Sequence, residues 1–378
     1  MKPIGLERGN MNQLKEVELV STGVYLPGEP VPFADLEKVL GKFDKAPPRV
    51  TKMENKLRAL AKELLGIEKV YYAIDPTTGE MTESNTSMAV KAIKDNLGKA
   101  RVDVNEIDCI LYGNGVADYQ TPPTSTLIQE ALGLEECAEI EVHSNCTGMS
   151  KMLQIGLDAI RLGRYKTVMI AYSQLSSAYL RSSYYNQEKV GTENILLRWF
   201  LCDGASSVLL RARDKVEKGI KLEYADNLSI AGTREMGMWF KLGVRNMDIK
   251  KAYEEGTHHF GQDYRAANDF GPYCFRRAFD KIVKDNNLKY QEIDHILATL
   301  PSKKLWEIGK NTFQKDYGIP TSKWFSNVNQ TGYAGASSVI IALNEMLDKG
   351  VFKPSQNLIS IIFESSKWMI GGFLLKHI

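Results

Sequence analysis

Cys146 is the residue of this chain best placed for chemistry, because it stands where a short strand-like run gives way to a segment with helical spacing. The apolar residues of that segment recur on one face of a helix: Met149, Leu153, Gly156 and Ile160. A thiol at the start of a helix lies near unpaired backbone N–H groups and the positive end of the helix dipole, which stabilise its thiolate. The same N–H groups can hold an oxyanion. The sequence therefore predicts a cysteine nucleophile, and the alternative is a buried structural cysteine.

A cysteine nucleophile needs a base, and two ionisable side chains are candidates. His143 lies three residues before Cys146 on the preceding strand, although alternation along a strand could equally point its ring away from the thiol. Glu364 ends an apolar strand, and in a pocket its carboxylate could accept a proton from an O–H, N–H or C–H group of an acceptor. The alternative for Glu364 is a surface glutamate paired with Lys367. His258 and His259 are expected at the surface, although a pair in a loop could reach a cleft, whereas His295 is expected to be structural and His377 to be solvated.

The elements that must position Cys146 are a strand, a tight turn, a helix and a second strand within residues 139–172. The helix is expected to run to about Arg161 and to be closed by Gly163. Lys42–Lys56, which contains two prolines, is interpreted as an irregular surface segment. The other expected elements are strands at 17–27, 107–113 and 167–172 and helices at 33–40, 84–97 and 126–132. Strands therefore alternate with helices, which predicts an α/β fold with a mixed, mostly parallel sheet.

The second half of the chain repeats the order of the first. Residues 104–111 (VNEIDCIL) are matched by residues 290–297 (YQEIDHIL). Later, residues 145–149 (NCTGM) are matched by residues 329–333 (NQTGY), and each of these segments leads into a helix and then an apolar strand. Two matches in the same order indicate an internal duplication.

The length of 378 residues exceeds the usual size of a single hydrophobic core, which agrees with two packed lobes. We place these lobes at residues 15–212 and 213–378 and expect them to be related by pseudo-twofold symmetry. The helices that follow Cys146 and Gln330 are rich in small and apolar residues. We therefore expect them to form the central buried pair.

Charge and composition argue against several classes of protein. The formal net charge is +2 with acidic and basic residues interspersed, which favours neither a nucleic-acid partner nor an anionic membrane. No apolar run approaches membrane-spanning length and Met1–Arg8 lacks a signal-peptide core, so we expect a soluble, cytoplasmic protein. The five cysteines are odd in number and contain no CxxC pair, which argues against a disulfide framework and against a metal site.

Five stretches of the sequence carry a family resemblance when they are taken together. They are Ser21–Pro27 with Asp35–Glu37, Gly66–Ile67, Cys146–Gly148, Cys202–Leu210 and Asn327–Ser338. In this combination the chain resembles the thiolase superfamily, and more closely its β-ketoacyl-ACP synthase III (ketosynthase III) branch. The resemblance implies a thiolase-like fold in which two pseudo-symmetric lobes form α/β/α/β/α layers, and it implies a homodimer. By the same resemblance, the aromatic-rich segment Ser176–Phe200 contributes to the dimer contact and the acyl pocket.

The resemblance also implies an enzyme that takes an acyl group from acyl-CoA or acyl carrier protein onto Cys146 without a permanently bound cofactor. In the usual family members a histidine and an asparagine of the second lobe assist decarboxylation of a malonyl thioester. This chain offers Ser302 and Tyr333 at those positions, and Phe363–Lys367 replaces the family's glycine-rich loop. Tyr333 could donate a hydrogen bond to a carbonyl or fill the pocket, whereas Ser302 cannot supply a base without help. Of the usual triad, only Cys146 remains.

Three hypotheses follow from the resemblance and its departures. The first is a ketosynthase III-like acyltransferase of specialised or lipid metabolism, which moves an acyl group from a small-molecule thioester or a carrier protein to a carbon, oxygen or nitrogen acceptor. The second is a catalytically reduced ketosynthase-like scaffold subunit of a multiprotein acyl-transfer complex. The third is a non-decarboxylative, thiolase-like C–C bond enzyme that uses Glu364 or His143 as its base.

Overall fold

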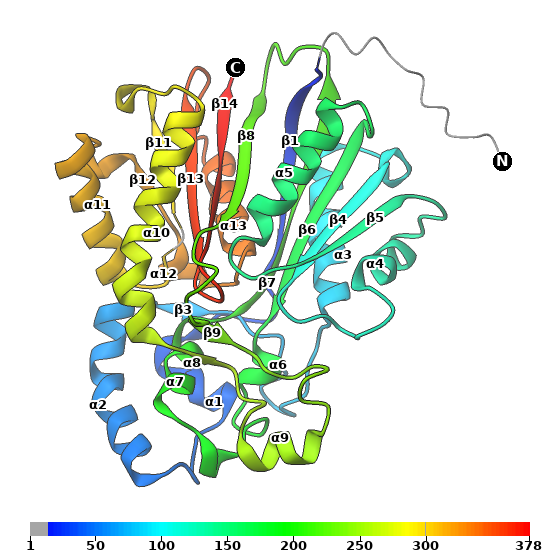
Figure 1. The fold of residues 1–378 in the computed structure, drawn as a ribbon. Coiled ribbons are helices and arrows are strands. Elements are labelled where there is room, and N and C mark those ends of the chain that lie inside the picture. Colours follow the sequence, from blue (N-terminus) through cyan, green and yellow to red (C-terminus); the bar gives the residue numbers. More distant parts are fainter. Residues whose placement is uncertain (1–13, 299) are drawn as a thin grey trace.

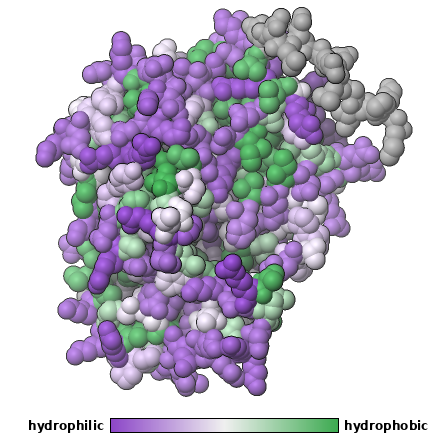
Figure 2. Space-filling model, in the orientation of Figure 1, coloured by the Kyte–Doolittle hydropathy of each residue, from purple (hydrophilic) through white to green (hydrophobic). Residues whose placement is uncertain are grey.

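The computed structural model describes residues 14–298 and 300–378 and shows a large mixed sheet with helices on both faces (Figure 1). The N-terminal stretch 1–8, in which no signal-peptide core is expected, lies outside the described residues. Within the described ranges, no helix is long and apolar enough to cross a bilayer. Figure 2 shows a mostly hydrophilic surface in the same orientation, with hydrophobic residues in small groups.

The main sheet has two halves with the same strand topology. Its strands are β1 (Glu16–Tyr25), β4 (Cys109–Asn114), β5 (Ala138–His143), β6 (Thr167–Leu175), β7 (Asp203–Arg213), β8 (Ile220–Ser229), β11 (His295–Leu297), β12 (Trp324–Phe325), β13 (Asn357–Glu364) and β14 (Met369–His377). They lie in the order β12-β11-β13-β14-β8-β1-β7-β6-β4-β5. Reading outward from the centre, β1-β7-β6-β4-β5 corresponds strand for strand to β8-β14-β13-β11-β12. The halves meet where β1 pairs with β8, at Glu18↔Lys221 and Leu19↔Ile220.

The longer helices form layers with the two halves of the sheet. They are α2 (Pro48–Leu65), α3 (Asn85–Ala100), α4 (Thr124–Leu132), α5 (Gly148–Arg161), α10 (Tyr264–Asp285), α11 (Lys303–Tyr317) and α13 (Ser337–Asp348). Side chains of α5 and α13 share one core with strands of both halves, which confirms the predicted central pair. The outer face of the first half packs against α3 and α4, and that of the second half against α10 and α11. The layers are therefore α/β/α/β/α.

A further hydrophobic core lies at the lower end of the molecule as drawn in Figure 1. Its short elements are α1 (Leu36–Leu40), α6 (Ser177–Leu180), α7 (Thr192–Ile195), α8 (Leu197–Phe200), α12 (Val328–Thr331) and the strand pairs β2 (Val31–Pro32) with β3 (Lys69–Val70) and β9 (Met238–Trp239) with β10 (Gly261–Gln262). Helix α9 (Ile249–Glu255) lies at the same end of the molecule. Tyr333 belongs to this core and Cys146 packs against it. These short elements therefore wall the region around the cysteine.

Helix α2 begins inside Lys42–Lys56, so the interpretation of that segment as irregular is wrong from residue 48 onward. Pro48 occupies the first turn, where its missing N–H would have had no helical partner. The helix closes at Gly66, whose φ of +67° lies in the left-handed region that glycine adopts readily. The helix is polar and largely exposed and begins at prolines, so its apolar residues show only weak helical periodicity in the sequence.

The repeated sequence segments have the same local structure. The 3-10 turns Val104–Glu106 and Tyr290–Glu292 lead into β4 and β11, which hold equivalent places in the two halves of the sheet. The proposed lobe boundary between residues 212 and 213 falls at the last residue of β7.

Candidate active site

Cys146 lies in the turn between β5 and α5, at the carboxyl end of the parallel strands β4 and β5. The Ser144 N–H donates to the Asn114 carbonyl at 3.0 Å, and the Tyr172 hydroxyl donates to the Ser144 carbonyl at 3.0 Å. Both bonds fix the turn to neighbouring strands. Gly148 starts α5 against the same tyrosine ring, and a Cβ added there would lie 2.8 Å from a ring carbon. Glycine therefore lets the helix begin this close to β6.

Glu364, the last residue of β13, buries its carboxylate against this turn, with 1% of the residue exposed. Its Oε2 atom accepts hydrogen bonds from the Ser144 hydroxyl at 3.1 Å, the Thr147 N–H at 3.0 Å and the Thr147 hydroxyl at 2.7 Å. Its Oε1 atom accepts one from the Ser366 hydroxyl. The carboxylate thus caps the N-terminus of α5, where negative charge is favoured. The alternative interpretation of Glu364 as a surface residue paired with Lys367 is wrong, because Glu364 is buried and the Lys367 ammonium donates to a backbone carbonyl instead.

Burial, followed by the negative charge of Glu364, raises the pKa of the Cys146 thiol to about 12. A backbone N–H lowers the pKa of the thiol, as expected at the start of a helix, but burial and Glu364 outweigh it. The Thr147 N–H already donates to Glu364, and the carboxylate offsets the positive end of the helix dipole. At neutral pH the resting residue is a thiol, so its proton must leave when the sulfur attacks.

Tyr333 lies beside the thiol. Its backbone N–H donates to the Phe200 carbonyl at 2.9 Å, and its carbonyl accepts from the Cys202 N–H at 3.1 Å, which fixes the residue between α8 and β7. The nearby phenol lowers the pKa of the Cys146 thiol, in opposition to burial and Glu364. Burial and the neighbouring sulfur raise the pKa of Tyr333 well above its usual value, so the phenol keeps its proton. Tyr333 can therefore donate a hydrogen bond at the reacting sulfur.

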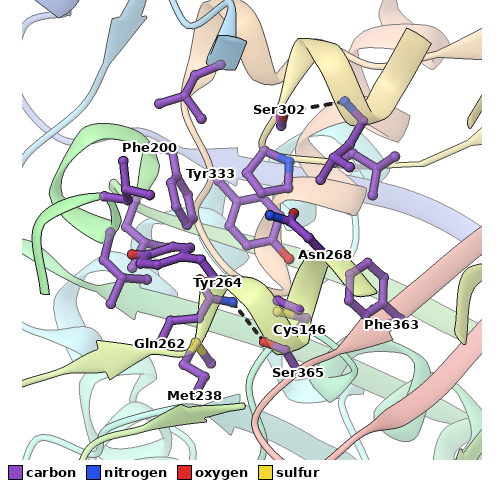
Figure 3. A pocket seen from close by; sticks show the side chains of 18 of the residues that line it. Cys146, Phe200, Met238, Gln262, Tyr264, Asn268, Ser302, Tyr333, Phe363 and Ser365 are labelled. Carbon is purple, nitrogen blue, oxygen red and sulfur yellow. Dashed lines mark hydrogen bonds between the residues drawn. The ribbon is translucent and has the colours of Figure 1, made fainter. Parts of the chain in front are cut away.

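Ser302 has a mainly structural environment. It is the N-cap of α11, where its hydroxyl accepts from the Leu305 N–H at 3.3 Å and donates to the Leu64 carbonyl of α2 at 3.2 Å. These bonds hold α2 and α11 together. Figure 3 shows Ser302 on the same cavity as Tyr333 and Cys146, with Tyr333 between the other two in this view.

The first cavity reaches Cys146 and has a volume of about 580 Å³. Most of its wall is apolar and comes from α2, α8, α10, α11 and β13. Leu64, Lys304 and Ile308 are exposed at its edge, which places an opening between α2 and α11. Gln262 closes another side by donating to the Ser365 hydroxyl at 3.0 Å (Figure 3). The space is suited to an extended, largely apolar ligand.

The second cavity, of about 1040 Å³, lies on the other side of the Cys146 turn. Its wall includes Glu364 and His143, the latter exposed at the end of β5. The backbone turn after β13 separates the two spaces, because Ser365 lines the first cavity while Glu364 and Ser366 line the second. The structure therefore brings Tyr333 and Ser302 to the cavity of Cys146. It brings Glu364 and His143 to the neighbouring one.

His258 and His259 are buried, so their expected exposure is wrong. The ring nitrogens of His258 lie 3.0 Å from the Ala252 carbonyl and 3.0 Å from the Tyr184 carbonyl. The Nε2 atom of His259 accepts from the Asn186 N–H at 3.1 Å, and burial together with the neighbouring imidazole lowers the pKa of His259 to about 4. Both rings join the α9 region to the segment that follows α6.

The other four cysteines are free thiols away from this turn: Cys109, Cys137, Cys202 and Cys274. Burial raises the pKa of Cys109 to about 12 and that of Cys274 to about 11. Within the part of the chain that the structure describes, no group of three or more His, Cys, Asp or Glu side chains is placed to hold a metal ion.

Sequence reasoning missed several polar residues of the site. Thr147 stands directly before α5 and is of a type favoured at helix caps, so its position offered a signal. Lys151, whose ammonium donates to the Ser144 hydroxyl at 2.9 Å, and Gln174, which lines the first cavity, carried no comparable signal. Their roles depend on contacts between distant parts of the chain.

Three comparisons with known proteins agree with this arrangement. The family model described as 3-oxoacyl-[acyl-carrier-protein] synthase III C terminal matches residues 283–365. The β-ketoacyl-[acyl-carrier-protein] synthase III of Clostridium perfringens (strain 13) is 24% identical over 364 residues, which cover 96% of this chain and 100% of the relative. That of Clostridium tetani is 25% identical over 363 residues, covering 92% and 95%. Along nearly its whole length, the chain is similar to ketosynthase III proteins.

Solved structures confirm the predicted thiolase-like fold. The tetronic acid condensing enzyme AbyA1 superposes with a TM-score of 0.79 at 20% identity, covering 95% of this chain and 99% of the other. The 3-oxoacyl-[acyl-carrier-protein] synthase III of Aquifex aeolicus gives 0.74 at 19%, covering 96% and 100%. A variant of OleA from Xanthomonas campestris gives 0.76 at 14%, covering 96% and 99%.

Proposed function

We propose that the protein is an acyltransferase that loads an acyl group from acyl-CoA or acyl carrier protein onto Cys146 and passes it to a carbon, oxygen or nitrogen acceptor. The observation that carries this proposal is the position of Cys146, on a rigid turn at a largely apolar cavity of about 580 Å³. The names of similar proteins, a β-ketoacyl-[acyl-carrier-protein] synthase III and a tetronic acid condensing enzyme, support the same class. We place the protein in specialised or lipid metabolism, as a cytoplasmic homodimer.

The first cavity has features that suit a thioester donor. Its apolar wall can hold an acyl chain or the arm that carries it. At its opening, the exposed ammonium of Lys304 suits the phosphate of CoA or of a carrier-protein arm. The phenol of Tyr333 lies where it can donate to the sulfur or to the thioester oxygen.

Loading then proceeds as a thiol exchange. The Cys146 sulfur attacks the thioester carbon, the C–S bond to the donor breaks, and the proton of the Cys146 thiol ends on the departing donor sulfur. Because burial and Glu364 keep the resting residue protonated, this proton transfer is part of the barrier. In the second half-reaction, the acyl carbon passes from Cys146 to the acceptor and the thiol is restored.

Intact-mass measurement after incubation with a panel of acyl-CoAs tests the proposal. We expect an acyl adduct on the wild-type chain that is absent from Cys146→Ala. Cys137→Ala removes a half-buried thiol elsewhere and should keep the adduct. An adduct that persists in Cys146→Ala would contradict the assignment of the nucleophile.

The scaffold hypothesis is favoured by a different observation, the protonated thiol of Cys146 beside the phenol of Tyr333, which also keeps its proton. It expects no adduct with any acyl-CoA or acyl carrier protein, together with a tight partner recovered in a pull-down. The thiolase-like alternative, with Glu364 or His143 as base, expects turnover without release of CO₂.

A further inference from the structure

The second cavity combines a buried carboxylate with an aromatic wall. Glu364 lies on one side with 1% of the residue exposed. On the facing segments, the Tyr179 ring lies 5.1 Å from the Phe240 ring and 5.3 Å from the Phe260 ring, and Tyr184 lies 6.2 Å from Phe240. All four rings line the cavity. Aromatic faces attract cations, as does the carboxylate. Two lysines also line the cavity, but the Lys241 ammonium lies over the Trp239 ring and that of Lys367 donates to the Arg234 carbonyl.

One oxygen of the Glu364 carboxyl group has room for another hydrogen-bond donor. Three of its hydrogen bonds converge on Oε2, while Oε1 accepts only from Ser366 among the described residues. A carboxylate oxygen can accept two hydrogen bonds, so Oε1 can take a ligand N–H. Within residues 14–298 and 300–378, Glu364 forms no ion pair. The ammonium of Lys151 is one step removed, through the Ser144 hydroxyl.

The cavity also adjoins the reacting sulfur. Asn145, Met238 and Phe260 line both cavities, and Asn145 directly precedes Cys146. Glu364 is bonded to Thr147, the residue that directly follows the cysteine. A ligand held by the carboxylate therefore lies against the turn that carries Cys146, at the lining that the two cavities share.

We propose that the second cavity binds a primary amine and that its nitrogen is the acceptor of the acyl group carried by Cys146. The inference rests on the proposed function, which leaves a carbon, oxygen or nitrogen acceptor open, and it selects nitrogen. A buried carboxylate without a paired cation gains from a cationic ligand, because burial penalises uncompensated charge. A malonyl thioester, which is an anion, would be repelled by the same carboxylate.

The chemistry balances without a further reactant. The amine arrives as an ammonium ion and gives one proton to the Glu364 carboxylate. Its lone pair attacks the acyl carbon, a C–N bond forms and the C–S bond to Cys146 breaks. The second proton of the nitrogen goes to the departing sulfur, which restores the thiol and leaves an amide. Glu364 then releases its proton to water, and no oxidation or reduction occurs.

The experiment starts from enzyme acylated on Cys146 and freed of donor. The acyl-enzyme is mixed with 2-phenylethylamine, with 2-phenylethanol of matched shape, or with malonyl-CoA, and both its decay and the products are followed by mass spectrometry. We expect the amine to discharge the enzyme at least ten times faster than the alcohol and to yield the amide. Glu364→Gln should slow the amine step by about 100-fold, the size of a general-base effect.

Two matched variants separate chemistry from folding. Glu364→Asp keeps a carboxylate and should restore part of the amine rate, while Glu254→Gln changes an exposed glutamate and should leave it unchanged. Phe240→Ala leaves the carboxylate in place, so it should raise the KM for the amine severalfold even if Glu364→Gln fails to fold.

Discharge that is as fast with alcohol or malonyl-CoA as with the amine, or an amine rate unchanged in Glu364→Gln, would overturn the inference and leave the proposed function standing. Failure of every donor to load Cys146 would overturn the proposed function, and the inference with it.

Discussion

Replacing Glu364 with glutamine should make Cys146 more reactive. The substitution removes a negative charge that is bonded to Thr147 and lies next to the thiol, while it keeps the size of the side chain. Less charge means that the thiolate costs less to form. A carboxylate in an active site is normally expected to activate a neighbouring nucleophile, so its removal would lower the reactivity of Cys146. Our reasoning predicts the opposite change, a higher reactivity.

The size of the expected increase in reactivity follows from the two causes that raise the pKa of Cys146. The pKa of Cys146 stands at about 12 against an ordinary 9.0, and burial is the larger cause. We assign about one pKa unit to the charge of Glu364, the lower end of the range for a neighbouring like charge. One unit corresponds to about 1.4 kcal/mol, so the thiolate fraction at pH 8 should rise about tenfold.

Alkylation by iodoacetamide measures this fraction, because the thiolate is the species that reacts. The rate at Cys146 is followed by intact mass between pH 7 and pH 10, with Cys146→Ala as background. Glu364→Asp keeps the charge and should react as the wild type does. A folded Glu364→Gln chain, by circular dichroism, that alkylates no faster than wild type would refute the reasoning.

Three other predictions concern hydrogen bonding, pH and packing. Tyr333→Phe removes the phenol that lowers the pKa of Cys146, so its alkylation should slow by about fivefold, as expected for about 1 kcal/mol. Burial raises the pKa of Asp203 to about 6, above its unfolded value of 3.8, so the folded chain binds more protons in this range. The free energy of unfolding contributed by Asp203 should therefore fall as pH rises from about 4 to about 6, and a Tm series against Asp203→Asn would reveal it. Gly148→Ala places a Cβ 2.8 Å from a buried tyrosine ring and should lower stability by about 1–3 kcal/mol in urea unfolding. Gly98→Ala should not destabilise, because a Cβ there would meet no described atom within 4 Å apart from its chain neighbours and the backbone of its own helix.

Local signals were enough for the elements that carry Cys146. Apolar spacing predicted α5, alternation and apolar runs predicted the flanking strands, and Gly163 marked the helix end. The repeat of 104–111 at 290–297 predicted the duplicated topology, because equivalent turns recur before β4 and β11. These features depend on residues that are close in the chain.

Long-range contacts explain what the sequence could not reveal. Glu364 caps α5 from 217 residues away, so neither its burial nor its effect on the thiol could be read from its neighbours in the chain. The pair His258 and His259 stands in a polar stretch, yet it becomes buried because Tyr184 and Asn186 fold over it. Helix α2 differs from the prediction for a local reason, since two prolines in a polar segment are typical of irregular structure and here stand at the start of a helix.

The contact between Glu364 and Thr147 joins the last residue of a strand in the second half of the sheet to the helix that begins beside Cys146 in the first. The pKa of the Cys146 thiol therefore depends on whether the two halves of the sheet have packed together. A folding intermediate with only the first half formed would carry a thiol without the carboxylate, and with less of it buried, so it would titrate closer to its ordinary range. Fast labelling of Cys146 during refolding, lost as the chain matures, would time the moment at which the two halves come together.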